Sequence, residues 1–217
     1  MTAPTPRRRS VDDDSLTEWF TLHKREVTWG VALVAVIAAG VWFYERSQSI
    51  KAQRAETAYY QARQAAASGN LPLAVSDLQK VVTRYDGTRA GSQAALTLAQ
   101  TFYEQKKYKE GIDALAKAEG NAPGDFKTSI HVLAAAGYEE LKDFVKAAEE
   151  YQKAADATRF PAEKAEFKAD AARNYTAAGK TDLAKGIWSE LAKDETSPLA
   201  AEARVRLGEL EAKPMTV

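Results

Sequence analysis

Apolar positions are concentrated in one uninterrupted run, residues 27–44, which holds 18 residues without a charged side chain. As a helix that rises about 1.5 Å per residue, such a run spans roughly 27 Å, close to the hydrocarbon thickness of a bilayer. Trp29 lies near one end of the run, and Trp42, Phe43 and Tyr44 lie at the other, as in the aromatic belts of membrane spans. The pattern predicts a transmembrane helix over 27–44.

Two other structures compete for this run. A cleaved signal peptide has an apolar core of about 7–15 residues behind a short basic head. Here the core is longer, 26 residues precede it, and the small residues Ala38, Ala39 and Gly40 are followed by bulky aromatic side chains. A buried core helix would normally keep one polar face. Length and flanks therefore favour a retained anchor in a lipid bilayer.

The polar flanks of the run suggest how it is placed in the membrane. Residues 1–14 are rich in proline, arginine and aspartate without apolar periodicity, which predicts a disordered tail. Residues 15–26 predict a short amphipathic helix that lays Trp19 and Phe20 at the membrane interface; a docking helix for a membrane partner is the alternative. Five Lys and Arg residues precede the run, and three, Arg46, Lys51 and Arg54, follow it within ten residues. This asymmetry predicts a cytoplasmic N-terminus.

Beyond residue 44 the pattern changes to amphipathic helices separated by short polar turns, without the sustained alternation that indicates strands. The pattern repeats. Small residues are spaced 37, 36 and 37 residues apart at Ala74, Gly111, Ala147 and Ala184. A large apolar residue follows each by four positions: Leu78, Leu115, Tyr151 and Trp188. Another small residue precedes each by twelve: Ala62, Ala99, Ala135 and Ala172. Such periodicity predicts stacked helical hairpins.

Composition excludes several kinds of chemistry. Formal net charge is zero, so nothing favours nucleic acid as a partner, and the absence of cysteine excludes disulfides and thiol nucleophiles. The two histidines, His23 and His131, lie on opposite sides of the predicted membrane span, so they are not expected to share a metal. Phosphate-binding loops and nucleophile elbows are not found in the sequence. We therefore expect no cofactor, no metal site and no enzymatic activity.

The repeat resembles the tetratricopeptide repeat, in which small residues let the two helices of a hairpin approach and aromatic residues such as Phe102, Tyr138 and Tyr175 fill the groove to the next hairpin. The usual unit has about 34 residues, so two or three extra residues must lie in the turns. The resemblance implies an all-α protein in which the transmembrane helix precedes a solenoid over 45–217. Its hairpins are expected at about 55–88, 92–125, 128–161 and 165–197, with a capping helix at 198–212.

The order of parts resembles one bacterial family more closely, the periplasmic tetratricopeptide-repeat ancillary subunits of the Sec translocon. The likeness lies in the architecture and in the segment from Trp42 to Gly69. It implies a single-pass protein of the bacterial inner membrane, with its repeat domain in the periplasm, that recruits chaperones or client segments to the translocon. The alternative is a permanent structural subunit of a large membrane complex, for example a respiratory or photosynthetic one.

In such repeats the first helix of each hairpin lines a concave groove that holds peptides or partner segments. Transferring the family's groove positions onto this sequence gives nine predicted contact residues: Tyr59, Arg63, Gln93, Leu96, Gln100, Tyr103, Val132, Glu139 and Arg173. Tyr, Arg and Leu suit a contact that is partly apolar and partly hydrogen-bonded.

Overall fold

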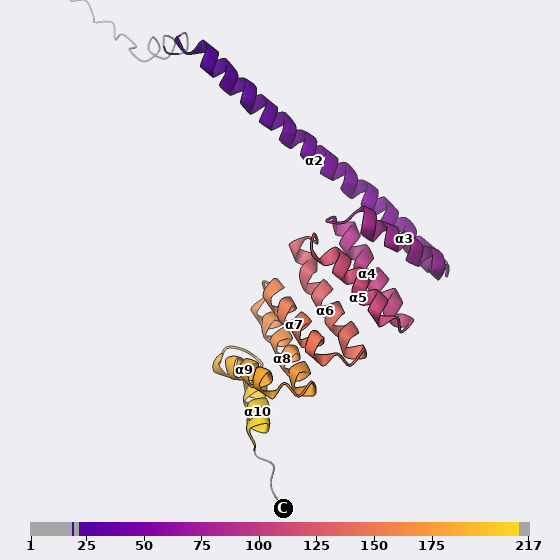
Figure 1. Cartoon of the computed structure of the whole chain (residues 1–217), viewed down its shortest axis with the longest axis vertical. Coiled ribbons are helices and arrows are strands. Elements are labelled where there is room, and N and C mark those ends of the chain that lie inside the picture. The colour runs from indigo at the N-terminus through magenta and orange to yellow at the C-terminus, as the bar shows by residue number, and fades with distance from the viewer. Residues whose placement is uncertain (1–18, 20–21, 213–217) are drawn as a thin grey trace, which may run out of the picture. The chain divides into compact units, whose positions relative to one another are not determined.

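A computed structural model describes residue 19 and residues 22–212, and the part of the chain so described folds into helices without any strand. Figure 1 shows the helices following one another as antiparallel neighbours from α3 onward. The all-α fold predicted from the sequence is confirmed. The helices are α2 (Lys24–Ala67), α3 (Leu71–Arg84), α4 (Arg89–Glu104), α5 (Tyr108–Glu119), α6 (Gly124–Glu140), α7 (Phe144–Ala157), α8 (Pro161–Ala177), α9 (Thr181–Lys193) and α10 (Ala200–Glu211).

The two helices of every hairpin are joined by the same three-residue turn. Its central residue has a positive φ, 80° at Gly69, 60° at Lys106, 60° at Lys142 and 70° at Gly179. In the second hairpin the Lys107 N–H donates to the Phe102 carbonyl, and equivalent bonds close the other three turns. This is the Schellman arrangement, which satisfies carbonyl groups left unpaired at a helix C-terminus. The turn therefore belongs to the repeat as much as the helices do.

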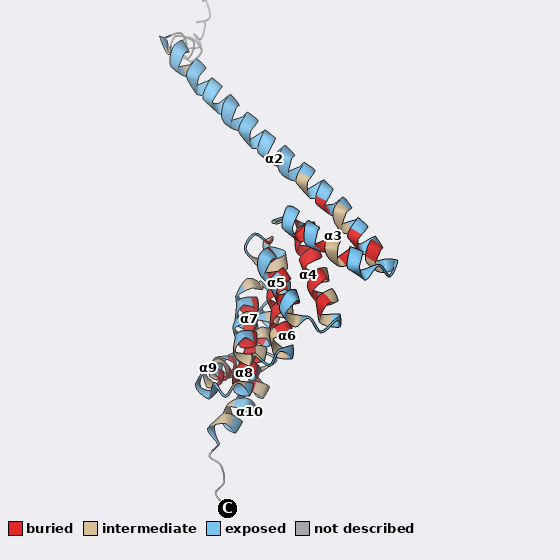
Figure 2. Cartoon of the chain, turned by 45° about the vertical axis from the view of Figure 1, so that its right-hand side comes forward, coloured by how far each residue is buried: buried red, intermediate tan, exposed pale blue. Residues whose placement is uncertain are grey.

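The repeated small residues form the seam between paired helices, as predicted. Ala62, Ala99, Ala135 and Ala172 on the first helices are each 0% exposed, and their partners on the second helices are also buried. The large residues one turn further on, from Leu78 to Trp188, are no more than 9% exposed. Figure 2 shows buried residues, in red, concentrated where the helices of the array lie against one another. A small residue brings two backbones together, and the large residue next to it fills the remaining space.

The buried side chains form two clusters. One joins the end of α2 to α3, α4, α5 and the first part of α6, around Leu78, Leu98 and Leu115. The other joins the rest of α6 to α7, α8, α9 and α10, around Trp188 and Ala172. Helix α10 closes the second cluster with Ala203, which is fully buried, so it serves as the predicted capping helix.

The first helices begin earlier than predicted. Helices α4, α6 and α8 start at Arg89, Gly124 and Pro161, where the sequence pattern suggested 92, 128 and 165. The Thr88 hydroxyl explains the first case, because it accepts a hydrogen bond of 3.0 Å from the Gly91 N–H and so caps the helix. Pro161 explains the third, because proline is preorganised for the first position of a helix.

Helix α2 runs without a break through the predicted span and into the first hairpin, as expected from the absence of proline and glycine in its second half. The chain divides at Ile50 into two compact units, Met1–Ile50 and Lys51–Val217. Among the described residues, α2 is the one helix long and apolar enough to cross a membrane, and no residue in its apolar window is buried.

Candidate protein-binding groove

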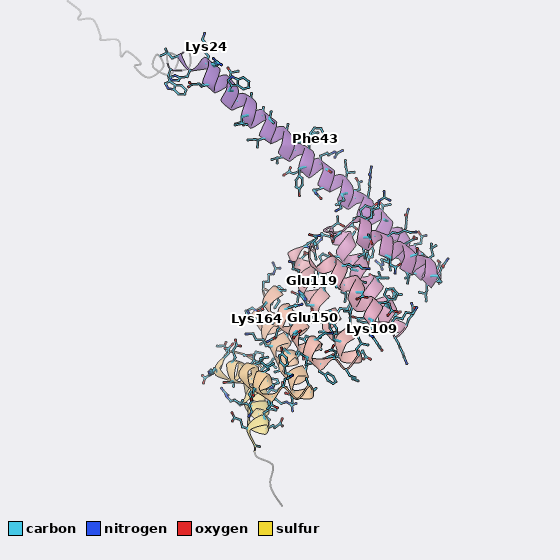
Figure 3. The ribbon with its side chains drawn as sticks, in the orientation of Figure 1. Lys24, Phe43, Lys109, Glu119, Glu150 and Lys164 are labelled. Atoms are coloured by element: carbon cyan, nitrogen blue, oxygen red, sulfur yellow. The ribbon has the colours of Figure 1, made fainter. Side chains whose placement is uncertain are left out.

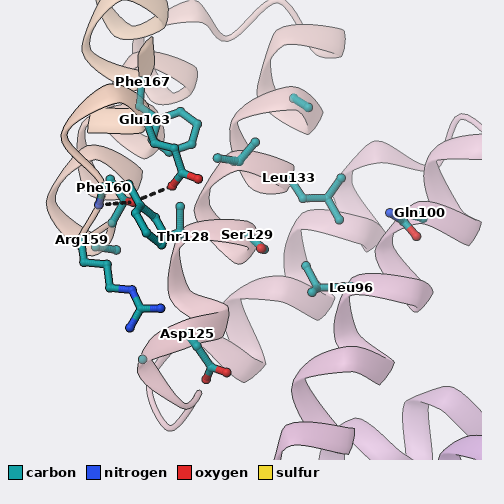
Figure 4. Close-up of a pocket in the computed structure, with 15 residues that line it drawn as sticks. Leu96, Gln100, Asp125, Thr128, Ser129, Leu133, Arg159, Phe160, Glu163 and Phe167 are labelled. Carbon is teal, nitrogen blue, oxygen red and sulfur yellow. Dashed lines mark hydrogen bonds between the residues drawn. The ribbon is translucent and has the colours of Figure 1, made fainter. Parts of the chain in front are cut away.

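A hollow of about 1010 Å³ opens between α4, α6 and α8, the first helices of hairpins two, three and four. The turn between α7 and α8 closes one side of it (Figure 4). Its lining residues are Leu96, Gln100, Gly124, Asp125, Thr128, Ser129, Val132, Leu133, Ala136, Ala157, Thr158, Arg159, Phe160, Glu163 and Phe167. The hollow is large enough to hold a short stretch of polypeptide.

Helices α6 and α8 form two of the walls of the hollow, to which they contribute Val132 and Phe167 respectively. Beyond the lining residues, the Asn174 Nδ2 on α8 donates to Glu139 Oε1 on α6 over 2.7 Å. This bond connects the two helices next to the hollow.

The middle of the hollow is apolar, with Leu96, Val132 and Phe167 contributed by three successive hairpins. All three are only partly buried, so their apolar surface faces the hollow as well as the core clusters. Phe160 lies at the mouth and is 50% exposed, and the Arg159 guanidinium lies 5.0 Å from its ring centroid. An exposed aromatic ring beside an apolar hollow provides an anchoring point for a partner side chain.

Polar groups surround this apolar centre. The Gln100 carboxamide is exposed on α4, and Thr128 and Ser129 lie on α6. The Glu163 carboxylate accepts a hydrogen bond of 2.6 Å from the Thr158 hydroxyl. Carboxamide and hydroxyl groups both donate and accept hydrogen bonds, so this rim can bond to a peptide backbone.

One end of the groove is charged. Arg173 on α8 bonds to Asp170 one turn earlier and to Glu202 on α10, and its guanidinium lies 5.8 Å from the Trp188 ring. Burial raises the pKa of Asp170; Arg173 opposes this rise, and the neighbouring carboxylates of Glu139 and Glu202 add to it. The pKa stays above its ordinary value despite the ion pair, chiefly because of burial and with a smaller contribution from the two carboxylates.

The structure brings together three of the nine predicted groove residues, Leu96, Gln100 and Val132, in the lining of the hollow. Glu139 and Arg173 lie one to two turns further along α6 and α8, where they bond to neighbouring helices. Gln93 is half-buried on α4, one turn before Leu96. None of these contacts identifies a partner, so all of these residues remain predictions as partner contacts.

Tyr59 and Arg63 lie apart from the hollow, on the last turns of α2. The hydroxyl groups of Tyr59 and Thr97 are 3.0 Å apart, which ties the first hairpin to the second. The Arg63 guanidinium lies 5.9 Å from the Tyr59 ring centroid and is exposed. Arg63 is therefore the more accessible of the two.

Tyr103, one of the nine predicted groove residues, packs against the small residues of neighbouring helices. Its ring lies directly against Gly111 and Gly137, where added Cβ atoms would overlap it. Its hydroxyl donates to the Leu133 carbonyl over 3.0 Å, and burial raises its pKa. Both glycines accommodate an aromatic ring between hairpins two and three, which a pattern of small residues alone does not reveal.

The groove residues predicted from the sequence do not include four residues that line the hollow: Phe160, Phe167, Thr128 and Ser129. A step of 36 residues from Leu96 gives Val132, but the next step of 37 gives Ala169, so the repeat pattern does not indicate Phe167. Phe160 lies in a turn between hairpins, outside the repeated positions. It enters the site only because the turn folds back beside α6 (Figure 4).

The predicted membrane-anchor residues are strongly exposed where the structure describes them. Trp29, Trp42, Phe43 and Tyr44 are between 61% and 70% exposed, and Trp19 is 51% exposed. The Trp19 ring stacks on His23 with centroids 4.9 Å apart. Phe20 and residues 1–18 lie outside the described part of the chain.

A second polar cluster lies inside the solenoid, around the buried His131 of α6. Its Nδ1 is 2.8 Å from Glu150 Oε2, and its Nε2 is 3.8 Å from Glu119 Oε1. Figure 3 labels Glu119 and Glu150 in the middle of the array. Burial alone would raise the pKa of Glu150, but hydrogen bonds from His131 and Lys153 together hold it below its usual value. The cluster connects α5, α6 and α7. Its role is structural, because its polar groups pair with one another between hairpins.

The fold and the groove define a class, the helical-hairpin repeat proteins that act as protein–protein interaction scaffolds. A family model of the tetratricopeptide repeat-like domain matches residues 17–212, and the chain belongs to this family. Repeat folds of this kind are typically non-catalytic.

Solved structures that are similar to this chain include one of putative kinesin light chain TPR-like repeats from Podosopora anserina. The sequence identity is 14% and the TM-score is 0.49. The match covers 72% of this chain and 85% of that chain. A second structure, of a variant of those repeats, gives the same identity and TM-score over 84% of its chain. No curated protein matches the sequence.

Proposed function

We propose that this protein is a membrane-anchored scaffold of the bacterial inner membrane whose periplasmic groove binds protein segments. In this role it recruits chaperones or client segments close to the protein translocon. The observation that carries the proposal is the hollow between α4, α6 and α8, which has an apolar centre and a hydrogen-bonding rim. Membership of the tetratricopeptide repeat-like family supports an interaction role for this surface.

The anchoring part of the proposal rests on α2. Its apolar window is long enough to span a bilayer and contains no buried residue, unlike the core helix of a soluble protein. Aromatic side chains at both ends of the window suit the two membrane interfaces. The excess of Lys and Arg before the window supports a repeat domain outside the cytoplasm.

Site-specific photocrosslinking tests the proposal in cells. A benzophenone amino acid replaces Gln100, which is exposed in the groove, and in a matched control it replaces Gln61, which is exposed on α2 outside the lining residues. We expect discrete adducts at position 100, which mass spectrometry should identify as a translocon subunit, a chaperone or an exported client.

Three outcomes separate the alternatives. Equal adducts at both positions, or none at position 100, would reject the groove as a binding surface. Adducts at position 100 to subunits of another stable membrane complex would instead support a permanent structural subunit. Adducts to cytoplasmic proteins would reject the periplasmic orientation.

A further inference from the structure

The groove does not end at its apolar centre, and the residues beyond that centre carry charge. One turn beyond Ala136 on α6 lies Glu139, and one turn beyond Phe167 on α8 lies Asp170. Three residues along a helix correspond to about 4.5 Å. The Asn174 amide on α8 bonds to Glu139 on α6, and the carboxylates of Glu139 and Asp170 interact electrostatically, so the two carboxylates lie close together next to the hollow.

Carboxylates outnumber cations at this end. Glu139, Asp170 and Glu202 come from three helices, and Arg173 bonds to two of them. Glu139 itself accepts hydrogen bonds from the Asn174 amide and the Tyr151 hydroxyl, both of which are neutral. Arg206 also approaches Glu202, at 3.7 Å, but it is shared with Glu209. The arrangement keeps an excess of negative charge.

The pKa values of Asp170 and Tyr151 are both raised, first by burial and then by nearby carboxylates. The pKa of Asp170 is raised although Arg173 is bonded to it, with burial as the largest cause and the nearby carboxylates as a further one. Burial also raises the pKa of Tyr151, and Glu139 and Asp170 raise it further. The side chains of Asp170 and Glu202 are 36% and 32% exposed, so an incoming cation can reach them.

We propose that the groove is selective for a protein segment that places apolar side chains over Val132 and Phe167 and a Lys or Arg side chain between Glu139 and Asp170. An extended chain advances about 3.3 Å per residue, so the basic residue lies one to three positions from the last apolar one. The inference rests on the groove function proposed above and adds the chemistry of the segment. Apolar burial provides affinity, and the carboxylates set the direction in which the segment lies.

Two labelled peptides test this selectivity on the full chain in lipid nanodiscs, where no detergent competes for the apolar hollow. One peptide has the sequence Ser-Leu-Phe-Leu-Ser-Lys-Ser-Lys, and the other carries Glu in place of both Lys residues. Fluorescence anisotropy measures binding. We expect the basic peptide to bind about tenfold more tightly, which corresponds to about 1.4 kcal/mol, because its Lys side chains can bond to the carboxylates.

Paired variants connect the preference to the carboxylates. Glu139→Gln with Asp170→Asn keeps the side-chain shapes and one acceptor oxygen in each side chain but removes both negative charges, and it should reduce the preference to less than about twofold. Glu110→Gln with Asp113→Asn removes two exposed carboxylates from α5, outside the groove lining, and should leave the preference intact. Melting curves of both double variants establish that each is folded.

Each outcome decides between the two proposals. If neither peptide binds, both the groove function and its selectivity are overturned. If both peptides bind equally, or the acidic peptide binds more tightly, the groove function stands and the selectivity is rejected. A preference that survives Glu139→Gln with Asp170→Asn also rejects the assigned carboxylates.

Discussion

Tyr103 shows how single residues connect one hairpin to the next. Its ring occupies space left by Gly111 on α5 and Gly137 on α6, and its hydroxyl bonds to the Leu133 carbonyl. The contact depends on two residues that have no side chain of their own. A methyl group at either position would displace the ring, because protein cores are packed closely.

Gly137→Ala should therefore destabilise the protein. A Cβ at this position would lie 2.7 Å from Tyr103 Cζ and 2.9 Å from Ile112 Cγ1, and such overpacking typically costs about 1–3 kcal/mol. Gly186→Ala is the matched control, because no atom lies within 4 Å of its added Cβ. Helix propensity predicts that this control stabilises α9 by about 0.5–1 kcal/mol. Circular dichroism melts of both variants measure the effects, and equal or higher stability of Gly137→Ala would contradict the assigned packing.

Glu150 should contribute stability that depends on pH. Its side chain is 14% exposed, and hydrogen bonds from His131 and Lys153 hold its pKa below the ordinary value. A carboxyl group with a lowered folded-state pKa stabilises the fold above its unfolded pKa of about 4.3, and this contribution is lost as pH falls through the folded-state pKa.

Glu150→Gln is expected to lower the melting temperature at pH 5, and the difference from the parent should shrink by pH 3. Loss of a hydrogen-bonded buried charge typically costs about 1–3 kcal/mol at neutral pH. Glu149→Gln, at the exposed neighbour, provides the control and should change little at either pH. A difference between Glu150→Gln and the parent that grows toward pH 3 would show that Glu150 is not stabilised as an anion.

At the scale of elements, α2 carries two kinds of surface in one helix. Residues within 24–50 expose apolar and aromatic side chains throughout, whereas Ala55, Ala62 and Ala65 in the last turns are buried in the repeat domain. The change from bulky to small residues along the same helix accompanies this change in surroundings. A lipid-facing surface needs apolar area, while a helix seam needs close approach of backbones.

The orientation of α2 can be tested by cysteine labelling, because the chain contains no natural cysteine. Lys213→Cys should react with a membrane-impermeant maleimide in intact spheroplasts, and Thr5→Cys should react only after lysis. The expectation follows from the excess of Lys and Arg before the apolar run. Reversed labelling would place the repeat domain in the cytoplasm.

At the scale of the whole repeat domain, stability comes from neighbours. Each hairpin contributes to a cluster shared with the next, and α6 supplies residues to both clusters through Ile130 and Ala135. The described contacts between helices involve elements that are adjacent or next but one along the chain. Arrays of this kind have a long concave surface whose residues are not needed for packing between repeats. The hollow lies on this surface.

The sequence by itself determined the helical repeat and the apolar run of α2. Both are local periodic properties: a small residue every 36 or 37 positions and a charge-free stretch of 18 residues can be read without knowing what lies nearby. Leu96 and Val132 were predicted as groove residues from the resemblance to the tetratricopeptide repeat, and both line the hollow.

Only the tertiary structure decided which side chains share the groove and which are used in packing. Tyr103 matched a groove position in sequence, yet it packs on glycines from two other helices. Phe160 belongs to no repeated position, yet its turn brings it beside α6. The negative end of the groove combines carboxylates from α6, α8 and α10, and their interaction depends on distances between helices that no pattern along one helix encodes.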